Sequence, residues 1–172
     1  VVNGGLTAAL GGLVESPISG IPFWEALLNK GFRLTAIGGS DNHDGPSTKP
    51  PVVGVPVTGV YADNLSDRAI LNAIRKGRVF VDTTGATTSL LELNSRRAMM
   101  GDTIRVRTSE RVPFTVHVAG VLGNVISIVE DAQKITPLDD VAIGFADERK
   151  TFVLTLDGKR HWLRADVRDA QG

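Results

Sequence analysis

The sequence predicts an α/β part over residues 1–85, followed by an antiparallel β-sandwich over residues 86–172. Three observations favour this fold class. A strand, a helix and a strand follow one another between residues 57 and 82, the pattern of a parallel β-α-β unit. After Gly85 the hydrophobic period becomes two and no helical period returns, as in antiparallel strands. With 172 residues, 42% of them hydrophobic, the chain can also bury a core.

In the first part we expect two helices and three strands. Pro22 suits the first turn of a helix and Gly31 its end, whereas Ser66 suits the cap of a second helix that Gly77 stops. The expected helices run from about Pro22 to Lys30 and from Ser66 to Gly77, and the expected strands cover residues 33–38, 57–62 and 78–82. Parallel pairing of these strands would place a functional edge at their carboxyl ends.

Six or seven strands are predicted in the second part, and six of them can be placed in the sequence. They cover Ser89–Asn94, Thr103–Arg107, Pro113–Ala119, Val125–Glu130, Thr151–Leu156 and Arg160–Val167. Asp157-Gly158 predicts a hairpin between the last two, because both residue types tolerate the positive φ of a tight turn.

Charge and composition exclude several classes of protein. Lys and Arg number 19, as do Asp and Glu, and the two parts are each neutral, so we expect neither a nucleic-acid nor a membrane partner. No apolar run approaches the roughly 20 residues of a spanning helix, which favours a soluble chain. From the composition of both ends we expect the chain to be part of a longer one. Neither the compartment nor the oligomeric state is indicated.

The absence of cysteine leaves imidazole and carboxylate as the ligands for any metal. Ser40-Asp41-Asn42-His43 follows an expected strand, directly after Gly38-Gly39. In extended backbone, alternate residues point to one side, so both side chains could bind one Zn, Mn or Fe ion. Ser40 and Asn42 could orient these ligands through hydrogen bonds. The alternative is that Ser-Asp-Asn-His is an ordinary turn.

Residues 23–31 (FWEALLNKG) and 36–43 (AIGGSDNH) resemble the last part of a PHP domain, named for polymerase and histidinol phosphatase. The closer similarity is to the branch of PHP-like metallohydrolases that includes carbaryl hydrolases. In that branch residues 69–81 (AILNAIRKGRVFV) resemble the closing helix and strand, and a β-rich domain follows.

The resemblance implies the C-terminal part of a distorted β/α barrel, with two or three divalent metal ions at the carboxyl ends of its strands. The ligands of that family come from an early H-x-H, from further His and carboxylate positions, and from a final D-x-H that matches Asp41 and His43. Val2-Asn3-Gly4 resembles the residues just after a Glu ligand of the family. The chain would thus carry two ligands of a larger set, bind metal incompletely and be inactive alone.

Two functions follow as expectations. In the first, the intact protein hydrolyses a phosphoester, or an ester, amide or carbamate, of a small molecule through a metal-bound hydroxide. In the second, the β-sandwich is a non-catalytic binding module for carbohydrate, peptide or another subunit, and the α/β part is a remnant. His117 and His161 are expected to be ordinary sheet residues, and Arg105, Arg107 and Arg111 a solvated face.

Overall fold

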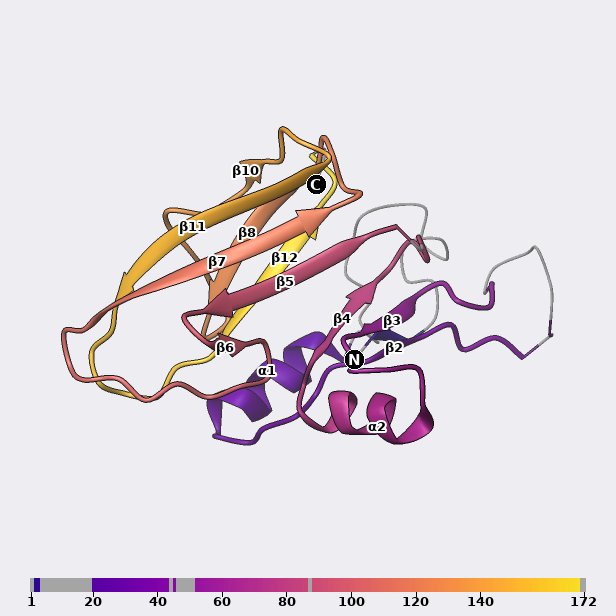
Figure 1. The fold of residues 1–172 in the computed structure, drawn as a ribbon, viewed down its shortest axis with the longest axis horizontal. Helices are drawn as coiled ribbons and strands as arrows, with labels where there is room; N and C mark the ends of the chain where they lie inside the picture. Colours follow the sequence, from indigo (N-terminus) through magenta and orange to yellow (C-terminus); the bar gives the residue numbers. More distant parts are fainter. Residues whose placement is uncertain (1, 4–19, 44, 46–51, 87, 171–172) are drawn as a thin grey trace. The chain divides into compact units, whose positions relative to one another are not determined.

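The computed structural model describes residues 2–3, 20–43, 45, 52–86 and 88–170 (Figure 1). The chain divides into two compact units, Val1–Thr87 and Thr88–Gly172. Within the described parts of the chain, neither helix has the length and apolar character needed to cross a membrane.

Unit 1 contains short strands and two helices of nine residues each. Its elements are β1 (Val2–Asn3), α1 (Ile21–Asn29), β2 (Gly38–Gly39), β3 (Val57–Val60), α2 (Asp67–Arg75) and β4 (Val79–Asp82). The strand β1 pairs with β2 in parallel, whereas β3 pairs with β4 antiparallel. Of the predicted strand over residues 33–38, only Gly38 lies in a strand of the structure.

The two helices agree with their sequence signals. Pro22 lies in the first turn of α1, and Gly31 follows its end with a φ of 101°, a value that favours glycine. At the start of α2 the Ser66 hydroxyl accepts a hydrogen bond from the N–H of Ala69, at 3.3 Å. Ser66 is therefore the N-cap of α2, as predicted.

The predicted β/α barrel is wrong. The strands on either side of α2 pair antiparallel, with Val60 opposite Val79 and Val57 opposite Asp82. The N–H of Tyr61 also donates to the carbonyl of Arg78, at 2.9 Å. The segment containing α2 therefore leaves and rejoins the pair at the same end, so α2 is an insertion in a hairpin rather than a crossover between parallel strands.

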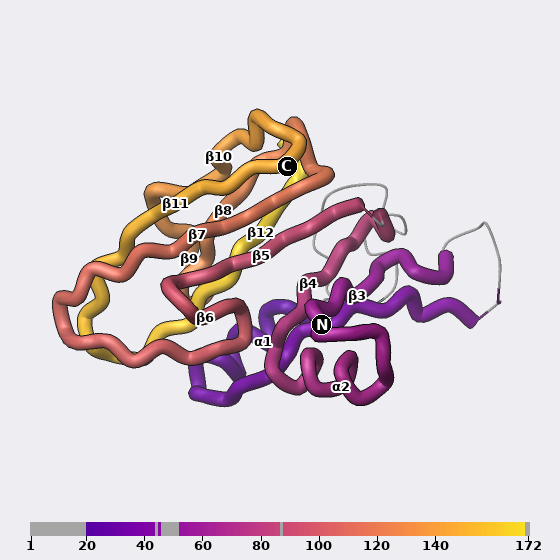
Figure 2. The backbone as a smooth tube through the Cα atoms, in the orientation of Figure 1, coloured from indigo at the N-terminus to yellow at the C-terminus, as the bar shows by residue number. Residues whose placement is uncertain are grey.

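Unit 2 consists of two antiparallel sheets of four strands each. Its strands are β5 (Leu90–Ser95), β6 (Ala98–Met99), β7 (Arg111–Ala119), β8 (Val125–Glu130), β9 (Gln133–Ile135), β10 (Val141–Ala142), β11 (Asp147–Thr155) and β12 (Leu163–Arg168). One sheet has the order β11-β7-β5-β6, and the other has the order β10-β8-β12 with β9 also paired to β8. Figure 2 traces the backbone through these strands. The antiparallel pairing expected for this part of the sequence is present.

The core of unit 2 lies between the two sheets. Alternate residues of β7, among them Val112, Phe114 and Val116, are buried together with Ile126 and Ile128 of β8. The ring of Phe114 stacks on Phe152 of β11 with centroids 5.4 Å apart. Each such side chain stabilises the fold by roughly 1.5–3 kcal/mol through its burial.

Two predictions for unit 2 are wrong. Asp157-Gly158 does not close a hairpin, because β11 pairs with β7 in one sheet and β12 pairs with β8 in the other. The turn instead carries the chain from sheet to sheet. Residues 103–107 show the predicted alternation of exposed and half-buried side chains but form no ladder with any described strand.

Candidate functional site

The candidate site begins where β2 packs on the β3–β4 pair. The Thr58 hydroxyl donates to the carbonyl of Gly38, at 2.8 Å, and accepts from the N–H of Gly38, at 2.9 Å. A Cβ on Gly38 would lie 2.6 Å from Cγ1 of Val81, whereas a Cβ on Gly39 would meet nothing within 4 Å. The backbone before Ser40 therefore packs closely against Thr58 and Val81 at Gly38 and is open at Gly39.

Asp41 and His43 lie together just beyond this strand. The Oδ1 atom of Asp41 is 3.4 Å from Nε2 of His43, and the two side chains are 53% and 82% exposed. The backbone between them is not extended as predicted, because Asp41 has a φ of 54°, which Asp tolerates better than most residues. Ser40 and Asn42 are half-buried beside the pair, and their hydrogen bonds to the two ligands stay a prediction.

The pair fits part of a metal site. Two ligands on one tetrahedral zinc ion, each bonded at about 2.1 Å, lie about 3.4 Å apart, which is the observed separation of the two donor atoms. Within the ranges that the structure describes, no group of three or more His, Cys, Asp or Glu side chains is placed to hold a metal ion. Two ligands are fewer than the three or four that stable zinc sites use, so weak binding is expected.

Asp82, at the end of β4, has a structural role that the sequence analysis did not assign. Its Oδ1 atom accepts hydrogen bonds from the N–H and hydroxyl of Thr84, both at 2.7 Å, and from the N–H of Gly85, at 3.2 Å. The sequence Asp-Thr-Thr-Gly carries the signal, because Asp side chains bind backbone N–H groups two or three residues ahead in turns. The carboxylate orders the turn after β4.

His117 lies on β7, on the side opposite the core, and is nevertheless buried. Its Nε2 atom is 2.9 Å from Asp147, and its Nδ1 atom is 3.3 Å from Glu92 and 3.2 Å from Arg149. The three partners come from the strands on either side of β7, so His117 connects β5, β7 and β11. The two carboxylates contact opposite ring nitrogens and do not converge on one point where a metal could bind.

His161 precedes β12 and joins two turns. Its Nδ1 atom is 2.7 Å from Asp131 and its Nε2 atom is 2.8 Å from Asp157. The hydrogen bond with Asp157, and then that with Asp131, raises the pKa of His161 above its ordinary value. Mainly because of the same bond with His161, the pKa of Asp157 falls to about 2. The position of His161 in the sequence did not indicate that Asp131 and Asp157 would be its partners.

Searches for related proteins do not assign the chain to a family. No family model, curated protein or solved structure matches it. The PHP resemblance therefore rests on the quoted sequence segments, and the site rests on the geometry of Asp41 and His43.

Proposed function

We propose that Asp41 and His43 are two ligands for a divalent metal ion in a metal-dependent hydrolase. The observation that supports this proposal most strongly is the 3.4 Å separation of Oδ1 and Nε2 on an exposed segment. An exposed ion pair of this kind contributes only about 0–1 kcal/mol to stability. Stability alone is therefore a weak reason for the two side chains to lie together.

The residue types match the chemistry of hydrolysis. A carboxylate oxygen and an imidazole nitrogen suit zinc, manganese or iron. When bound, such an ion lowers the pKa of a water molecule and polarises a phosphoryl or carbonyl group. Asp41 and His43 would hold the ion, and the packing of Gly38 against Thr58 and Val81 would fix the segment that carries both ligands.

Calorimetric titration of the chain with zinc tests this proposal. We expect weak binding in the unaltered chain, and a loss of about tenfold or more in affinity in the double variant Asp41→Ala/His43→Ala. Hydrolysis of a nitrophenyl phosphate ester should be slow with two ligands and should fall to the rate of free metal in the double variant. Equal zinc affinity in the two proteins would contradict the proposal.

A second candidate function, a binding module in unit 2, is favoured by the distribution of charge. Seven basic residues and three acidic ones lie within residues 96–111 and 157–161, whereas the rest of unit 2 has five basic and nine acidic residues. The neutral total of this part of the sequence thus conceals a basic region. Such a region supports an anionic partner for the module.

A further inference from the structure

Residues 103–107 have the side-chain pattern of a strand. Thr103, Arg105 and Arg107 are exposed, whereas Ile104 and Val106 are half-buried and pack against the hydrophobic core of unit 2. The alternation is the one expected for an extended segment with one side on the core.

Among the described residues, no strand pairs with the backbone of this segment. Within the described part of the chain, no hydrogen bond joins the N–H or C=O groups of residues 103–106 to another residue. Both ends are nevertheless held: the N–H of Asp102 donates to Met99, at 3.0 Å, and the N–H of Arg107 donates to Glu110, at 2.9 Å. An anchored, extended backbone with unused donors and acceptors is a template for an additional strand.

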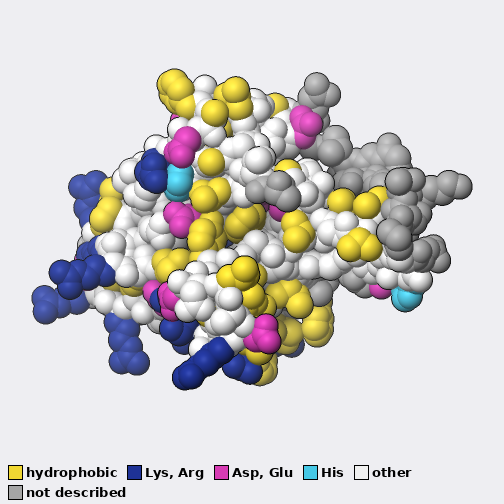
Figure 3. All heavy atoms as spheres, turned by 45° about the vertical axis from the view of Figure 1, so that its right-hand side comes forward, with side chains coloured by type: hydrophobic (Ala, Val, Ile, Leu, Met, Phe, Trp, Pro, Cys, Tyr) yellow, Lys and Arg dark blue, Asp and Glu magenta, His cyan; other side chains and the backbone are white. Residues whose placement is uncertain are grey.

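Basic side chains surround this template. The N–H of Ser109 donates to the carbonyl of Leu156, at 2.7 Å, and the N–H of Leu156 donates to the carbonyl of Glu110, at 3.1 Å. The loop after residue 107 therefore adjoins the turn at 157–160. The basic residues of these segments and of the β5–β6 turn are Arg96, Arg97, Arg105, Arg107, Arg111, Lys159 and Arg160. Figure 3 shows basic side chains gathered along the left of the view.

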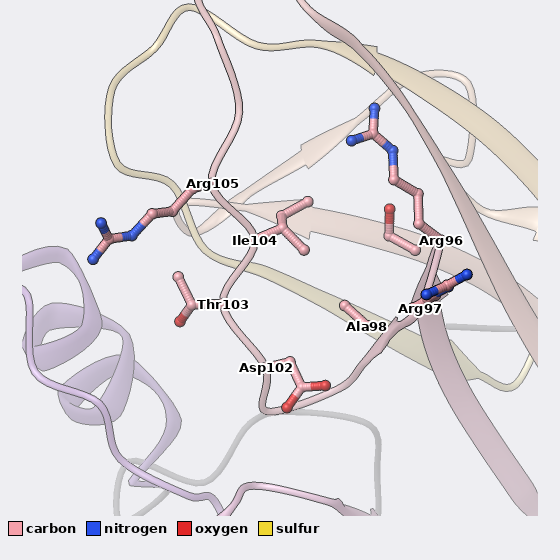
Figure 4. Close-up of a pocket in the computed structure, with 8 residues that line it drawn as sticks. Arg96, Arg97, Ala98, Asp102, Thr103, Ile104 and Arg105 are labelled. Carbon is pink, nitrogen blue, oxygen red and sulfur yellow. The ribbon is translucent and has the colours of Figure 1, made fainter.

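A hollow of about 610 Å³ lies between the β5–β6 turn and the start of the template. Figure 4 shows Arg97 on one side of it and Arg105 on the other. Arg96 is already bound to Glu110, at 2.5 Å. Arg97, Arg105 and Arg107 are exposed. Among the described residues, Glu110 attracts Arg107 electrostatically, but no carboxylate lies within ion-pair distance of the three side chains.

We propose that residues 103–107 bind an extended acidic peptide of a partner protein as an added β-strand. In residues 103–107 and in the added peptide alike, alternate residues of a strand are about 6.6–6.8 Å apart. Asp or Glu at every second position of the peptide would therefore face Arg105 and Arg107. Backbone hydrogen bonds would provide affinity and the arginines specificity. This inference rests on the binding-module function of unit 2 and is independent of the metal site.

The composition of the basic region favours a peptide over other anions. None of the exposed large hydrophobic side chains of unit 2, which are Leu122, Phe145 and Val153, belongs to residues 96–111 or 157–161. These segments thus offer no aromatic platform for unpaired bases and no apolar wedge for a membrane. A nucleic-acid duplex, which is recognised through its phosphates, is the remaining alternative.

Binding of a short blocked peptide that alternates Glu and Val, measured by fluorescence anisotropy on the full chain, tests the proposal. We expect Arg105→Glu/Arg107→Glu to weaken binding about tenfold or more. The matched control Arg68→Glu/Arg75→Glu reverses two exposed charges on α2 and should leave the affinity unchanged. A peptide with Gln in place of Glu should bind the unaltered chain about as weakly as the Glu peptide binds the charge-reversed variant.

Two further peptides separate strand addition from simple charge attraction. One carries N-methyl groups on its Glu amides and the other on its Val amides, and only the version whose methyl groups face the template should lose binding. Amide exchange at alternate residues of 103–106 should also slow when the unmodified peptide binds. If both methylated peptides and a short DNA duplex bind as well as the unmodified peptide, strand addition is wrong although unit 2 still binds anions. If no anionic probe binds, the binding-module function is wrong as well.

Discussion

Asp41 takes a left-handed backbone conformation, yet its carboxylate still lies 3.4 Å from the imidazole of His43. The closeness of the two side chains could be expected from a spacing of two residues. The backbone conformation between them could not, because a spacing of two residues does not reveal a positive φ at Asp41. Partners distant in sequence, such as Asp131 for His161, are set by strand pairing and leave no local signal.

The protonation of His161 should make stability depend on pH. Its pKa is raised by Asp157 and Asp131, so the bound imidazolium stabilises the fold fully below the unfolded pKa of about 6.5 and loses this contribution as the pH rises through the higher folded pKa. Asp157, with a pKa of about 2, stays ionised throughout this range.

Urea unfolding of the unaltered chain and of His161→Gln checks this prediction at about pH 5.5 and about pH 8.5. The substitution should lower the free energy of unfolding more at the lower pH. An equal loss at the two pH values would mean that the charge of His161 contributes nothing.

At the scale of elements, both helices and most long strands could be predicted from hydrophobic period and capping residues. The direction of β3 and β4 could not, because a period describes which side chains are buried and not which way a neighbouring strand runs. Antiparallel pairing is instead visible in tertiary details, such as the hydrogen bond between Tyr61 and Arg78. Strands of two or three residues, such as β6, β9 and β10, are too short to show any period.

Gly38 and Gly39 offer a test of how β2 is held. Gly38→Ala should lower the free energy of unfolding by about 1–3 kcal/mol, because the added methyl group would overlap Val81. Gly39→Ala, with open space around its Cβ, should change stability by less than about 0.5 kcal/mol. Denaturant titration of the two variants provides the comparison, and equal effects would show that β2 does not pack closely on Val81.

At the scale of the molecule, burial is uneven between the units. Among the described residues, Ala73 and Pro56 are the buried apolar residues of unit 1, and all the other buried hydrophobic residues belong to unit 2. Composition predicted that the chain could form a core. How many of the buried hydrophobic residues each unit contains depends on how the sheets pair. The balanced charge of each part likewise gave no sign of the basic region, because acidic residues elsewhere in unit 2 offset the five basic residues of 96–111 and the two of 157–161.

Phe114→Ala should therefore destabilise unit 2 by about 3–5 kcal/mol, since it removes a ring stacked on Phe152 in the core. Trp162 is the one tryptophan of this unit and Trp24 the one of unit 1. In a Trp24→Phe background, fluorescence during urea unfolding reports unit 2 alone and should show an earlier midpoint. An unchanged midpoint would contradict the assignment of Phe114 to the core.

Paramagnetic broadening by Mn²⁺ tests most directly whether Asp41 and His43 bind a metal together. In a titration followed by amide NMR signals, the signals of residues 39–43 should broaden first, and Asp41→Ala/His43→Ala should abolish this effect. The variant Asp139→Ala/Asp140→Ala, which removes two neighbouring exposed carboxylates of unit 2, should leave it unchanged. Broadening of residues 39–43 that persists in the Asp41→Ala/His43→Ala variant, or that begins at Asp139 and Asp140 instead, would contradict the proposed metal site.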